Sequence, residues 1–222
     1  MNNIKKIIFS RFKIFSLLSI SMLLSIVLLM IRMKLNHSFF YLFLVWNLFL
    51  AVIPFAITTY LISLSKLNKV GLVFWFCTWL LFLPNAPYII TDLLHLKVSN
   101  THVLWLDILV VSSFALNGFL LFFYSLMDMR SLLNRFTKPS KTNHFMVFTL
   151  FLCGFGVYLG RFLRYNSWEI LQNPLNLFND ILNITLYPNQ HPEAWLFTMV
   201  FGTFLNLGFW MFKTILNTTV NA

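Results

Sequence analysis

Six long apolar stretches, separated by short segments that carry Lys and Arg, dominate the hydrophobic pattern of the chain. An α-helix needs about 20 mostly apolar residues to cross the hydrocarbon core of a bilayer. One stretch, 70–83, is short for a crossing unless the segment after it completes the span. The pattern predicts an all-α, polytopic transmembrane bundle in one domain over 1–222, with crossings at about 14–31, 39–64, 70–83, 103–126, 145–163 and 194–216.

The first stretch begins like a signal peptide, because Lys5, Lys6, Arg11 and Lys13 precede it. It is longer than a typical signal-peptide core, and Arg32 follows it where a small-residue cleavage site would be expected. We therefore expect an uncleaved first transmembrane helix.

Two prolines interrupt the chain directly after the third stretch. Pro84 and Pro87 remove backbone donors and end a helix, and Asn85 between them can cap a new one. We expect a short interfacial or re-entrant helix over 84–97. A second surface segment, amphipathic in pattern, is expected over 166–190.

Three features inside the stretches predict how helices bend or meet. Pro54 is expected to bend the second crossing, because it removes one backbone hydrogen bond. Gly156 and Gly160 have the small-xxx-small spacing that lets two helices approach closely. For Asn117 and Gly118, a packing contact with a neighbouring helix is the favoured interpretation.

Composition restricts the class of protein further. Hydrophobic residues make up 59% of the chain and charged residues 10%, whereas a soluble domain has roughly 25% charged residues. The net charge of +10 comes from basic residues between the apolar stretches and not from one basic face, which argues against nucleic-acid binding. The expected partners are membrane lipids, whose anionic headgroups attract such loops, and a membrane protein is a further candidate.

The distribution of Lys and Arg sets the expected orientation. With six crossings, 11 of the 16 basic residues fall on the side that holds both termini, and 5 fall on the other. Because Lys and Arg are enriched in cytoplasmic loops, both termini are expected in the cytoplasm. Arg32 and Lys34, directly after the first crossing, oppose this choice locally.

The same topology gathers most acidic residues and histidines at the outer face. Ionisable groups near a membrane are costly unless they are paired or solvated, so this gathering predicts a shared outward-facing polar site. The residues are Asp92, Asp107, Glu169, Asp180 and Glu193, with His37, His95, His102 and His191.

Asp92 and His95 are three residues apart and share a helical face, with Tyr88 one turn earlier. This pair could hold a metal or relay a proton. A carboxylate that fixes a histidine is favoured over metal binding, because no HExxH or similar ligand spacing occurs. We predict no metal site and leave cofactors open.

Two arginines form a second candidate element, because Arg161 and Arg164 share a face with Trp168. Their planar guanidinium groups could grip a phosphate or carboxylate. Interfacial anchoring, or an ion pair with Asp92 or Asp107, is the favoured interpretation. The predicted polar cluster, in which no residue is assigned a catalytic role, comprises Asn85, Tyr88, Asp92, His95, Asp107, Arg161, Arg164 and Trp168.

Several motifs together resemble an uncharacterised bacterial membrane family, domain of unknown function 1361. They are Leu83-Pro84-Asn85-Ala86-Pro87-Tyr88 with Thr91-Asp92-Leu93 and His95, Trp105-x-Asp107, Ala115-Leu116-Asn117-Gly118, and Gly160-Arg161-Phe162-Leu163-Arg164-Tyr165-Asn166-Ser167-Trp168. The resemblance covers the chain from about Phe39 to Phe212. It implies a multi-pass protein of the bacterial cytoplasmic membrane and brings no activity.

Three functions compete on these observations. The favoured one is a non-catalytic membrane subunit, in which the polar and small residues are packing devices. An alternative is a membrane enzyme acting on a lipid or lipid-linked substrate at the outer face, with Asp92 and His95 as acid and base and Arg161 and Arg164 holding an anionic group. A small transporter would explain the helix broken near Pro84, but ionisable residues are scarce at mid-bilayer depth.

Overall fold

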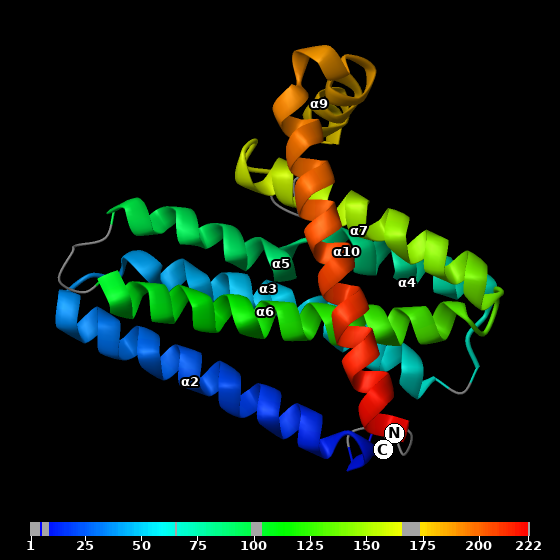
Figure 1. Ribbon diagram of the computed structural model, residues 1–222, viewed down its shortest axis with the longest axis horizontal. Coiled ribbons are helices and arrows are strands. Elements are labelled where there is room, and N and C mark those ends of the chain that lie inside the picture. The colour runs from blue at the N-terminus through cyan, green and yellow to red at the C-terminus, as the bar shows by residue number, and fades with distance from the viewer. Residues whose placement is uncertain (1–4, 6–8, 65, 99–103, 166–173, 222) are drawn as a thin grey trace. The chain divides into compact units, whose positions relative to one another are not determined.

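The computed structural model describes the chain except residues 1–4, 6–8, 65, 99–103, 166–173 and 222. Its helices belong to two compact units, Met1–Leu132 and Leu133–Ala222, and Figure 1 gives their labels. The expectation of a single domain over 1–222 stays a prediction.

The first unit contains five α-helices and two short 3₁₀ segments in its described part. In chain order they are α2 (Phe12–Asn36), η1 (Phe40–Leu42), α3 (Phe43–Ser63), α4 (Lys69–Phe82), α5 (Asn85–Tyr88), η2 (Ile89–Val98) and α6 (Leu104–Leu133). The second unit contains α7 (Pro139–Arg161), α9 (Pro174–Leu186), η4 (Pro188–Gln190) and α10 (Pro192–Asn221).

Six helical stretches of the described residues are long and apolar enough to cross a membrane. They are Phe12–Asn36, Phe40–Ser63, Lys69–Lys97, Leu104–Leu133, Pro139–Arg161 and Pro192–Thr218. The predicted all-α bundle with six crossings is therefore confirmed. The third span includes the segment after the proline break, which supplies the length that 70–83 lacks.

Burial differs sharply between the helices of the first unit. α6 carries much of the core, because Phe114, Leu121, Phe122 and Leu126 on this helix are almost completely buried. α2 exposes most of its apolar side chains, as a helix that faces lipid does. α6 is therefore the natural support for any polar group that the unit holds away from solvent and lipid.

The break after α4 has a local cause in the two prolines. Pro87 has no N–H to donate to the carbonyl of Leu83, so that carbonyl accepts from Ala86 N at 3.3 Å in a tighter turn. The Asn85 side chain donates to the carbonyl of Phe82 at 2.9 Å. Asn85 was expected to cap the start of the new helix, and this was wrong: it caps the end of α4, and Pro84 occupies the N-cap of α5.

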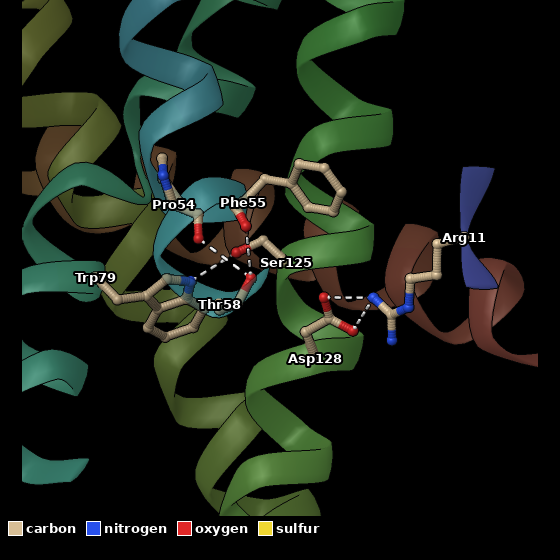
Figure 2. A network of polar contacts seen from close by, with 7 residues as sticks. All are labelled: Arg11, Pro54, Phe55, Thr58, Trp79, Ser125 and Asp128. Carbon is tan, nitrogen blue, oxygen red and sulfur yellow. Dashed lines mark hydrogen bonds and ion pairs between the residues drawn. The ribbon is translucent and has the colours of Figure 1, made fainter. Parts of the chain in front are cut away.

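Helix α3 continues through Pro54. Thr58 Oγ1 lies 3.2 Å from the carbonyl oxygen of Pro54 and 3.1 Å from that of Phe55, and Figure 2 shows both contacts. In the same view, beside Thr58, Trp79 Nε1 donates to Ser125 Oγ at 2.6 Å and ties α4 to α6. The expected bend at Pro54 stays a prediction.

In the second unit, α7 and α10 approach closely at a pair of glycines. A Cβ added at Gly154 would lie 3.1 Å from the backbone nitrogen of Gly202, so side chains at this crossing would force the helices apart. Gly156 and Gly160, where the sequence predicted a close approach, are half-buried on the same helix. Their role in helix packing stays a prediction.

Helix α9 (Pro174–Leu186) lies within 166–190, where the sequence predicted an amphipathic surface segment. The location of this segment at the membrane surface stays a prediction. The Tyr165 hydroxyl donates to Asp180 Oδ2 at 2.7 Å, and Trp195 Nε1 donates to the carbonyl of Ile184 at 3.1 Å. Ile184 is buried, whereas Leu175 and Phe178 are exposed. Residues 166–173 of the predicted segment lie outside the described residues.

Candidate functional site

A buried ion pair between Arg32 and Asp107 joins the last turns of α2 to the first turn of α6. Arg32 Nε donates to Asp107 Oδ1 at 2.7 Å, and Arg32 Nη2 donates to Asp107 Oδ2 at 3.3 Å. The exposed fractions of the two side chains are 6% and 0%. A charge this deeply buried is tolerated only when it is paired and hydrogen-bonded.

The remaining contacts of Arg32 complete its surroundings. Its Nη1 donates to the carbonyl of Ser38 at 3.2 Å, and its Cζ lies 4.5 Å from the ring centroid of Tyr41. The electron-rich face of an aromatic ring attracts a guanidinium group. The Tyr41 hydroxyl in turn donates to the carbonyl of His95 at 3.4 Å, which connects this ion pair to η2.

Asp92 and His95 form the second part of the same site. Asn47 Nδ2 donates to Asp92 Oδ2 at 2.9 Å, and His95 Nε2 lies 3.9 Å from Asp92 Oδ1. The Asp92 side chain is 1% exposed and the His95 side chain 36%. The rings of Phe40 and Phe43 contact the imidazole at 5.8 and 5.2 Å between centroids.

We call these side chains the six-residue cluster: Arg32, Tyr41, Asn47, Asp92, His95 and Asp107. It holds two buried carboxylates, one buried guanidinium and one partly exposed imidazole. Within the described residues, no three His, Cys, Asp or Glu side chains are grouped as metal ligands would be. Chemically, the cluster can hold its helices together by charge, and Asp92 with His95 can relay a proton to the surface.

Local structure explains why Asp92 and His95 meet. The segment that carries them, η2, is a 3₁₀ helix, in which residues i and i+3 lie directly above one another. The Thr91 hydroxyl donates to the carbonyl of Tyr88 at 2.6 Å and supports the start of this turn.

Three of the eight residues in the predicted polar cluster, Asp92, His95 and Asp107, belong to the six-residue cluster. Asn85 and Tyr88 lie in α5, where Asn85 caps α4 and Tyr88 is half-buried.

The two predicted arginines belong to the second unit. Arg161 ends α7, and Arg164 is exposed and has a left-handed backbone, with φ 62°. Trp168 lies outside the described residues, as do Glu169 and His102. Asp107, expected as an ion-pair partner for Arg161 or Arg164, pairs with Arg32. An association of Arg161 and Arg164 with Asp92 stays a prediction.

Sequence reasoning missed Arg32, Tyr41 and Asn47. Two of them carried a signal in the sequence. Arg32 opposed the charge bias that sets the orientation, which is expected of a cation that is paired inside the protein instead of standing free in a loop. Asn47 is an amide within an apolar stretch, where it needs an internal hydrogen-bond partner. Tyr41 carried no such signal.

Two further polar contacts connect α2 to α6. At the opposite end of the unit, Arg11 Nη1 donates to both carboxylate oxygens of Asp128 at 2.8 Å, as Figure 2 shows. Between the two ion pairs, Asn117 Nδ2 donates to Ser25 Oγ at 3.0 Å. Polar contacts at both ends of α2 and between them therefore attach it to α6. Asn117 makes the predicted packing contact with a neighbouring helix.

Gly118 makes the close helix contact that the sequence predicted for the pair Asn117-Gly118. A Cβ added at this position would lie 2.4 Å from the carbonyl oxygen of Ala86 and 3.2 Å from Ile89 Cδ1. The turn between Pro84 and Pro87 therefore rests directly on the backbone of α6. This contact brings two of the sequence motifs together.

These helices and this buried cluster define a multi-pass α-helical membrane protein. The chain belongs to the family described as Protein of unknown function (DUF1361), which matches residues 46–207. No curated protein and no solved structure matches the chain. The matched range includes Asn47, Asp92, His95 and Asp107, whereas α2 with Arg32 precedes it.

Proposed function

We propose that this protein is a non-catalytic subunit of a membrane complex, and that the six-residue cluster fixes the helices of the first unit. The observation that supports this proposal is the burial of both carboxylates, since the Asp107 and Asp92 side chains are 0% and 1% exposed. A carboxylate that serves as acid or base needs access to its substrate. Buried, paired charges are instead typical of groups that fix one arrangement of helices.

The proposed partners are membrane lipids and a second membrane protein, in a bacterial cytoplasmic membrane. Large apolar side chains are exposed along α2 and α10, among them Leu23, Val200 and Trp210. Such surfaces suit lipid chains or the apolar face of another transmembrane helix.

Co-purification tests the subunit proposal directly. We expect the full-length protein, extracted from its native membrane in a mild detergent, to carry one companion membrane protein at a constant ratio over repeated preparations. The measurement is quantitative mass spectrometry of the purified sample. A monomer without a reproducible companion would contradict the proposal.

One observation favours the enzyme alternative and supplies the control. His95 is partly exposed above the buried Asp92, an arrangement in which a carboxylate can orient an imidazole. If the protein is a subunit, His95→Ala keeps the companion and complements a deletion strain, because the contacts of Arg32 with Asp107 and of Asn47 with Asp92 still fix the helices. If it is an enzyme, His95→Ala abolishes complementation while the protein stays folded. His144→Ala, at an exposed histidine of α7, is the matched control.

The small-transporter alternative loses part of its support. It was suggested by the helix break near Pro84, and this break has a packing role, because Asn85 caps α4 and Ala86 rests on Gly118.

We further propose that both termini are cytoplasmic, on the basis of the distribution of Lys and Arg. Alkaline phosphatase, which is active outside the cytoplasm, is expected to be inactive when fused after Ala222 and active when fused after Arg164. Green fluorescent protein should give the opposite pattern. Active phosphatase after Ala222 would overturn this orientation.

A further inference from the structure

The second unit has an apolar groove of about 380 Å³ between α7 and α10. The two helices approach closely at Gly154 and Gly202, and the ring of Phe151 packs against Gly202 at the same place. From this crossing the helices diverge toward the start of α7 and the end of α10, as Figure 1 shows, and the groove lies in the space between them.

The lining of the groove suits a hydrocarbon chain. Its buried side chains include Met146 and Leu150, and its exposed ones include Val147 and Leu207. Both helices are long and apolar enough to cross a membrane. Water is not held in an apolar space, because it finds too few polar partners there. An acyl chain fills such a space with favourable contacts.

The length of the groove matches one leaflet of a bilayer. Its lining on α10 runs from Thr203 to Lys213, a separation of ten residues, which corresponds to about 15 Å along a helix. The hydrocarbon core of a bilayer is about 30 Å thick, so each leaflet contributes about 15 Å. The groove therefore has the length of one lipid tail and not that of a whole transmembrane helix.

Two polar side chains, Asn143 and Lys213, line the end of the groove that is farther from the two glycines. Asn143 lies four residues inside the start of its membrane span at Pro139, and Lys213 lies five residues inside the end of its span at Thr218. These separations correspond to about 6–8 Å along a helix. A long Lys side chain near the end of a transmembrane helix reaches the headgroups from this depth.

The charge at this end of the groove is positive. The half-buried Lys213 lines it, and the sequence has no Asp or Glu in 133–161 or in 203–222. Basic side chains at the membrane surface attract anionic lipid headgroups. The amide of Asn143 can in addition donate a hydrogen bond to a phosphate oxygen.

We propose that this groove binds one anionic glycerophospholipid. One acyl chain lies between α7 and α10, and the phosphate accepts hydrogen bonds from Lys213 and Asn143. The site specifies one lipid among the proposed partners, and it does not depend on the proposed role of the protein as a subunit.

Native mass spectrometry of the full-length protein in a mild detergent tests the headgroup. The probes are phosphatidylglycerol and phosphatidylcholine with identical acyl chains, each titrated separately. We expect one phosphatidylglycerol to bind about fivefold more tightly than phosphatidylcholine, because one lysine favours the anionic headgroup. Lys213→Gln should remove this preference. Lys141→Gln, at an exposed lysine of α7 that does not line the groove, should keep it.

Filling the groove tests where the acyl chain lies. Val147 lines the groove, whereas the neighbouring Phe148 is 57% exposed and does not. Val147→Trp should abolish tight binding of both lipids, and Phe148→Trp should leave it unchanged. Thr203→Phe, on the α10 wall, gives the same test if Val147→Trp does not fold.

Equal binding of the two lipids by the unaltered protein would overturn the proposal. So would the same lipid preference in Lys213→Gln and Lys141→Gln, or equal binding by Val147→Trp and Phe148→Trp. If Val147→Trp keeps both lipids and loses its companion in co-purification, a partner helix fills the groove instead. That result would support the proposed subunit and overturn the lipid site.

Discussion

Replacing Asp107 with asparagine is expected to lower the free energy of unfolding by about 3–5 kcal/mol, because it leaves the Arg32 guanidinium buried without a counter-charge. The asparagine side chain has nearly the same shape, so the loss measures charge and not packing. The free energy of unfolding can be obtained by titration with sodium dodecyl sulfate in mixed micelles.

Two further variants separate the charge effect from general damage. The double variant Arg32→Met with Asp107→Leu should recover most of the lost stability, because it removes both buried charges together. Asp128→Asn at the opposite end should cost about 1 kcal/mol, because its partner Arg11 remains 30% exposed. A loss from Asp107→Asn no larger than that from Asp128→Asn would contradict the tight burial of the first pair.

Replacing Gly118 with alanine is expected to lower the free energy of unfolding by about 3 kcal/mol, the upper part of the range for overpacking. The new methyl group would meet the backbone carbonyl of Ala86, and a backbone atom cannot swing away as a flexible side chain can. α6 and the turn over Asn85–Tyr88 would have to separate. The same detergent titration measures this effect.

Gly71→Ala is the matched control for this second prediction. A Cβ at Gly71 would lie 2.6 Å from Asn68 Oδ1, the end of a side chain that can rotate away at the loss of one helix cap. The expected cost is about 1 kcal/mol. Equal stability of Gly118→Ala and the unaltered protein would show that the two motifs do not meet as described.

The six crossings could be predicted from the sequence because hydropathy is a local property of each stretch. Several helix ends could not be predicted, and Asp128 and Arg32 show why. Charges mark the expected ends of crossings, but Asp128 pairs with Arg11, and α6 continues to Leu133 beyond the expected 126. Arg32 pairs with Asp107, and α2 continues to Asn36 beyond the expected 31. A paired charge does not need to leave the helix for water.

Part of the candidate site was also within reach of sequence reasoning. The spacing of Asp92 and His95 predicted their contact, because it depends on one short helix. The contacts of Arg32 with Asp107 and of Asn47 with Asp92 depend on how separate helices pack, which no spacing along the chain encodes. The partner of Gly118 was hidden for the same reason: a glycine indicates a close approach without naming the backbone that approaches.

The attachment of α2 has a mechanical consequence. Arg11, at the N-cap of α2, and Arg32 within α2 are 21 residues apart, and so are their partners Asp107 and Asp128 on α6. If α2 slid by one helical turn, about 5 Å, both ion pairs and the Ser25 contact would break at once, and no second alignment would restore them. These contacts therefore fix the position of α2 along α6. α2 can separate from its neighbours as a whole, but it cannot slide along them in small steps.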